Sequence, residues 1–81
     1  MTARPWLNEV IEGHRFYRLE VARYGERLAL VVGPTTDGRY QARVGGWRRD
    51  TRELAEVGDL LSTEATAEGA KKVALAWASG V

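Results

Sequence analysis

The chain has 81 residues, a formal net charge of +1 and no cysteine. That length allows one hydrophobic core, so we expect a single domain over residues 1–81. The lack of cysteine excludes disulfides, thiolate metal sites and cysteine nucleophiles, and we see neither a signal-peptide pattern nor an apolar run of roughly 18 to 20 residues. We therefore expect a soluble, cytoplasmic protein that has no membrane partner.

The charges are distributed unevenly along the chain. Between Gly13 and Arg52 nine arginines face four carboxylates, whereas from Glu53 onward five carboxylates face two lysines. A basic middle and an acidic end are typical of a surface that contacts an anion, and arginine is also the ordinary basic residue of a GC-rich genome. Both interpretations stay open at this point.

The first segment has a helical pattern. Four apolar residues fall on one side of a helical wheel: Trp6, Leu7, Val10 and Ile11. Pro5 suits a first helical turn and Gly13 suits the exit, so the pattern predicts a short N-terminal helix. An extended arm is the alternative.

From His14 onward the apolar period changes to two, which predicts β-strands. We expect a first strand from His14 to a turn at residues 24–26, a second at about 27–32 and a third at 39–44. Gly33-Pro34 should end the second strand, and Asp37-Gly38 is typical of the following turn. Gly45-Gly46 suggests a bulge or the close approach of another backbone.

Two further elements follow. Residues 50–62 fit either a helical turn ended by Gly58, with Asp50 and Glu53 as its cap pair, or a short strand over 57–61; the helical turn is favoured. Thr66 is a good N-cap for a final helix whose apolar face we expect to lie across the sheet. The predicted fold is α+β, a three- or four-stranded antiparallel meander packed against a C-terminal helix, with a short N-terminal helix.

The sequence offers no catalytic constellation. His14 is the single histidine, and neither Ser62 nor Ser79 has an evident base partner. Acidic residues do not cluster at metal-ligand spacing, and the glycines match no phosphate-binding loop. We expect a protein that is not an enzyme and has no catalytic residue, metal site or cofactor.

The sheet face opposite the final helix is the candidate partner-binding surface. Together with the segment after the third strand, it carries Phe16, Arg18, Arg27, Val31, Arg43, Trp47, Arg48 and Arg49. Apolar side chains among arginines suit a protein partner or self-association, and Glu20 on the same face would repel phosphate. In the alternative, the arginines bind nucleic-acid phosphates while Phe16 or Trp47 stacks on bases. Arg18 and Arg43 are expected to be exposed on this face. Reversing both arginines to Glu should therefore leave the stability of the fold nearly unchanged.

Two resemblances bear on function. The element order and the segment Thr66-Ala67-Glu68-Gly69-Ala70-Lys71-Lys72 are similar to the double-stranded-RNA-binding domain, although Ala67 and Glu68 stand where that family places basic residues, so that only Lys71 and Lys72 match. Residues 15–78, a meander followed by a Thr-capped helix, resemble small orphan proteins of bacteriophages and mobile elements, some of which bind and inhibit host machinery, CRISPR complexes included. This resemblance implies a non-enzymatic binding or inhibitory module.

Overall fold

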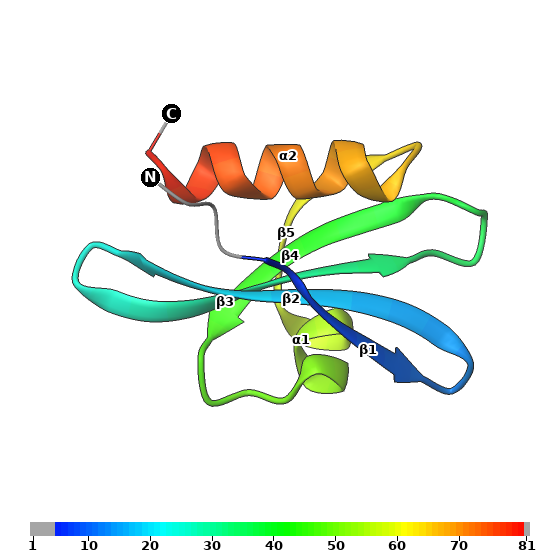
Figure 1. The fold of residues 1–81 in the computed structure, drawn as a ribbon, viewed down its shortest axis with the longest axis horizontal. Coiled ribbons are helices and arrows are strands. Elements are labelled where there is room, and N and C mark those ends of the chain that lie inside the picture. Colours follow the sequence, from blue (N-terminus) through cyan, green and yellow to red (C-terminus); the bar gives the residue numbers. More distant parts are fainter. Residues whose placement is uncertain (1–4, 81) are drawn as a thin grey trace.

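The computed structural model describes residues 5–80, which form a five-stranded antiparallel sheet with one helix on each face (Figure 1). The elements are β1 (Leu7–Ile11), β2 (His14–Arg23), β3 (Glu26–Pro34), β4 (Tyr40–Gly46), α1 (Thr51–Val57), β5 (Asp59–Glu64) and α2 (Ala67–Ala78). The order of strands in the sheet is their order in the sequence. The predicted meander, C-terminal helix and α+β class are confirmed.

The predicted N-terminal helix is wrong, because residues 7–11 form a β-strand. Its five residues pair in antiparallel register with β2, from Leu7 opposite Arg18 to Ile11 opposite His14. A helix this short gains few backbone hydrogen bonds, whereas a strand pairs along its whole length with the preformed edge of β2. The extended arm that we kept as the alternative is therefore the better description.

Two-residue turns join the first three strands. Glu12 and Gly13 both have positive φ, at 52° and 82°, and so do Tyr24 and Gly25, at 55° and 76°. A turn with two positive φ values has the twist that matches neighbouring antiparallel strands, and glycine at its second position adopts that backbone without strain. These two turns fix the registers of β1 with β2 and of β2 with β3.

The larger core lies under α2, on the sheet face that we call the α2 face. Its buried residues are Leu19, Leu30, Val32, Ala42, Val44, Ala70 and Ala74. The alternation of the strands brings the five sheet residues to one side, as predicted. Thr66 accepts a hydrogen bond from the Gly69 N–H at 3.1 Å and begins the helix, and Trp77 packs against the core near its end.

Residues 50–62 contain both of the elements that we treated as alternatives. Asp50 accepts a hydrogen bond from the Glu53 N–H at 2.6 Å and starts α1, which ends at Gly58, and β5 begins at the next residue. The Gly58 N–H donates to the Leu54 carbonyl at 2.9 Å, and a side chain on Gly58 would collide with that carbonyl. One glycine therefore allows a helix to turn directly into an edge strand.

A second, smaller core lies on the opposite side of the sheet, the α1 face, where Ala29, Val31 and Leu54 are buried. The Leu54 side chain occupies the space that a Cβ on Gly45 would fill. The close approach at Gly45 is thus made by a side chain and not by the backbone that we expected, and the bulge lies between Ala42 and Arg43, where β4 pairs with β5.

Candidate binding surface

Arg18 lies on the α1 face, as its alternation with Leu19 in β2 predicts. Its Nη2 donates to the carbonyl oxygens of Trp47 and Arg49, both at 2.9 Å, and its Nη1 lies 3.5 Å from the Thr51 Oγ1. The guanidinium also lies 4.7 Å from the centre of the Trp47 ring. Arg18 therefore ties the segment before α1 to the sheet.

Arg43 plays the same part at the other end of α1. Its Nη1 donates to the carbonyl oxygen of Gly58 at 2.6 Å, and its Nη2 donates to the Gln41 Oε1 at 3.2 Å. Both arginines are half-buried. The two residues that we expected to be exposed on an open face thus hold the two ends of a helix that lies on that face.

The expectation of an open face opposite α2 is wrong at its centre. Val31 is 1% exposed and packs with Leu54, and Phe16 is half-buried against the same cluster. The apolar residues among arginines are therefore explained by a second core. The signal for this cover was the helix cap at Asp50 followed by Leu54, whose position over the sheet no local pattern specifies.

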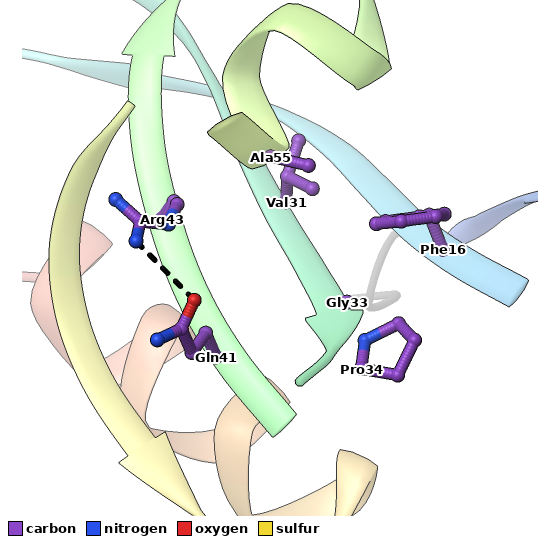
Figure 2. Close-up of a pocket in the computed structure, with 7 residues that line it drawn as sticks. All are labelled: Phe16, Val31, Gly33, Pro34, Gln41, Arg43 and Ala55. Atoms are coloured by element: carbon purple, nitrogen blue, oxygen red, sulfur yellow. Dashed lines mark hydrogen bonds between the residues drawn. The ribbon is translucent and has the colours of Figure 1, made fainter. Parts of the chain in front are cut away.

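A shallow hollow lies beside α1 (Figure 2). It is lined by Phe16, Val31, Gly33, Pro34, Gln41, Arg43 and Ala55, has a cavity volume of about 20 Å³ and is open to solvent. The Phe16 ring lies against Gly33 and occupies the space that a Cβ there would need. Sites for small molecules usually exceed about 300 Å³, so this hollow is small for a ligand.

The remaining predicted residues gather at the turn between β4 and α1. Arg27 donates its Nε to the Glu20 Oε2 at 2.7 Å and lies 5.5 Å from the centre of the half-buried Trp47 ring. Arg49 lies 3.8 Å from the Glu53 carboxylate, and Arg48 is exposed. We call Trp47, Arg48 and Arg49 the 47–49 segment. Together with Arg27, Glu20 and Glu53 it forms a mixed-charge surface.

The first strand supplies a site that our sequence reasoning missed. Leu7 and Val10 are 57% and 65% exposed, and they lie on an outermost strand of the sheet. Between them, Glu9 accepts a hydrogen bond from the Thr51 hydroxyl at 2.7 Å. The signal was the Glu12-Gly13 pair directly before β2, which is typical of a hairpin turn, whereas we read residues 7–11 with a helical period.

Arg52 and Asp37 have shifted pKa values. The pKa of Arg52 is raised, chiefly by its hydrogen bond to Glu12 and then by Glu56. The pKa of Asp37 is lowered, chiefly by the hydrogen bond that the Thr35 hydroxyl donates and further by the backbone N–H and charge of Arg39. Within residues 5–80 no three His, Asp or Glu side chains gather in a way that could hold a metal ion.

We predict that Thr35→Val raises the pKa of Asp37 toward its ordinary value, because the variant cannot donate the hydrogen bond that favours the carboxylate. A lowered folded-state pKa adds stability above the unfolded pKa, and that stability is lost as pH falls through the folded pKa. Thr35→Val should therefore lose less stability on acidification than the parent. Carboxyl NMR titration and acid unfolding check this, with Thr36→Val as the control; an unchanged midpoint would contradict it.

The chain matches no protein-family model, no curated protein and no solved structure. Neither helix in the described part of the chain has the length and apolarity that a membrane crossing requires.

Proposed function

We propose that this protein is a non-enzymatic domain that acts by binding another protein. The observation that carries the proposal is that the outermost strand β1 exposes a large apolar side chain on each of its two faces, Leu7 on one and Val10 on the other. No described strand pairs with the outer side of β1, and open strand edges bind other chains readily. Such a module would act by occupying a surface of its partner, as small inhibitory or accessory phage proteins do.

Nucleic-acid binding is the second candidate, and the exposed Arg48 next to Trp47 is the observation that favours it. Three other arginines of the predicted surface argue against phosphate contact, because they already have partners within the chain. Arg18 and Arg43 bind backbone carbonyls, and Arg27 is paired with Glu20. A net charge of +1 is small for a domain dedicated to phosphate contact, so we place this candidate second.

Selection from a random-peptide display library tests the proposal. We expect the parent protein to enrich peptides that the double variant Leu7→Ser, Val10→Ser no longer binds, since both side chains are exposed and their exchange should leave the fold intact. A variant of the 47–49 segment, Arg48→Glu, should bind the same peptides as the parent. Thermal unfolding of both variants controls for stability.

A parallel titration uses a labelled duplex and a labelled single strand at low and physiological salt. Binding to phosphates releases counterions and weakens steeply with salt, whereas an apolar contact depends only mildly on it. Tight, salt-sensitive binding that Arg48→Glu abolishes, together with no enriched peptide, would overturn the proposed function and establish the second candidate.

A further inference from the structure

The two edges of the sheet differ in how far they are open to another strand. At β5 the ladder is interrupted by the bulge at Ala42 and Arg43, and α2 packs against this strand. At β1 the register with β2 is regular over five residue pairs. Bulges and covering helices are the usual means by which edges are protected, so β1 is the open edge of the sheet formed by residues 5–80.

The turn after β1 determines which of its backbone groups face outward. In a two-residue turn with positive φ at Glu12 and Gly13, the flanking Ile11 and His14 form a hydrogen-bonded pair. Hydrogen-bonded and non-hydrogen-bonded pairs alternate along an antiparallel ladder. Asn8 and Val10 therefore direct their N–H and C=O groups away from β2, where an added strand can pair with them.

Glu9 is a carboxylate held in place on this edge. Its Oε1 accepts from the Thr51 hydroxyl at 2.7 Å, and Thr51, which is 2% exposed, lies in turn next to the Arg18 Nη1. Among residues 5–80 only Thr51 donates to the Glu9 carboxylate, and the Glu9 side chain is partly exposed, so a donor from outside can reach it. Leu7 and Ile11 flank Glu9 on the same face of the sheet.

We propose that β1 accepts an extended segment of the partner protein, and that this segment carries a lysine or arginine opposite Glu9 with an apolar residue two positions to either side. The inference rests on the proposed function and names its partner chemistry. The basic side chain pairs with Glu9, and the two apolar side chains pack on Leu7 and Ile11, since cross-strand neighbours on one face are the contacts that stabilise a sheet.

The same charge argues against a second copy of this chain as the occupant. In an antiparallel dimer formed through β1, Asn8 of each copy would lie opposite Val10 of the other copy. Glu9 would then lie directly opposite Glu9 of the other copy. That position is a close, non-hydrogen-bonded pair, with Cα atoms about 4.5 Å apart, where like charges are destabilising. If the register of this β1–β1 pair shifts by two residues in either direction, the ladder between the two copies has to include Trp6 or the turn residue Glu12.

Labelled peptides test the inference directly. The probe is Thr-Val-Thr-Lys-Thr-Val-Thr, compared with the same peptide carrying Glu in place of Lys and with a shuffled peptide of equal composition. In NMR titrations of the parent protein we expect the amides of Asn8 and Val10 to shift, with the Lys peptide bound about fivefold more tightly than the Glu peptide. The variant Glu9→Lys should reverse that preference.

A backbone variant separates strand addition from side-chain contact. Val10→Pro removes an N–H that points outward, so it should abolish peptide binding while the fold is retained, and Val10→Thr, which keeps the N–H, should still bind. Equal binding of the Lys and Glu peptides, full binding by folded Val10→Pro, or a dimer of the parent in sedimentation would overturn the inference. If library peptides bind through Leu7 and Val10 but ignore Glu9, the inference fails and the proposed function stands.

Discussion

Replacing Leu54 by alanine should lower the free energy of unfolding by about 2 to 5 kcal/mol, as truncation of a buried leucine does. Leu54 is fully buried and is the residue through which α1 packs on Ala29 and Val31. A helix of seven residues is too short to persist alone, so loss of this contact should also release α1 from the sheet. Urea unfolding measures the first effect, and amide hydrogen exchange in α1 measures the second.

Val57→Ala is the matched control for that experiment. It shortens another aliphatic side chain of α1, but Val57 is 58% exposed, and we expect a change within about 0.5 kcal/mol. Equal unfolding midpoints for Leu54→Ala and the parent would show that the second core does not stabilise the domain.

Reversing the charge of Arg18 should cost about 3 kcal/mol or more. The arginine donates to two backbone carbonyls at 2.9 Å, and hydrogen bonds of charged groups contribute about 1.5 to 3 kcal/mol each. In Arg18→Glu both carbonyls lose their donor, and a carboxylate comes close to their oxygens and to Thr51. The expectation from sequence that this reversal is harmless is therefore replaced by its opposite.

The control is Arg48→Glu, the same exchange at an exposed position of the adjoining segment, which should change stability by no more than about 0.5 kcal/mol. Chemical denaturation of both variants is the measurement. If Arg18→Glu unfolds at the same denaturant concentration as Arg48→Glu, Arg18 is not a structural tie.

Local patterns predicted much of the fold. Alternation identified the strands that became β2, β3 and β4 and assigned their faces, although β3 runs through Pro34 and β4 continues to Gly46. Both helix caps, Asp50 and Thr66, were read from residue type and spacing. These features depend on interactions between residues that are close in the chain. Patterns in a single sequence predict such local interactions well.

What failed depended on contacts between distant residues. Residues 7–11 have a helical apolar pattern, and their pairing with β2 nevertheless makes them a strand. The face that carries Arg18 and Arg43 was assigned correctly, but the Arg18 contacts to Trp47 and Arg49 span about thirty positions in the chain. No local pattern shows that a later helix covers an earlier sheet face, and so the centre of that face, which we expected to be open, lies under α1 in a second core.

The order of the sheet has a consequence for how fast the chain folds. Every strand pairs with its neighbour in sequence, so three of the four strand pairs close over connections of five residues or fewer. Short connections lose little entropy when they close, and a high share of local contacts is associated with rapid folding. The two hairpins with two-residue turns should form within microseconds, before either helix docks. We therefore expect the registers of β1, β2 and β3 to be set before α1 and α2 pack on the sheet.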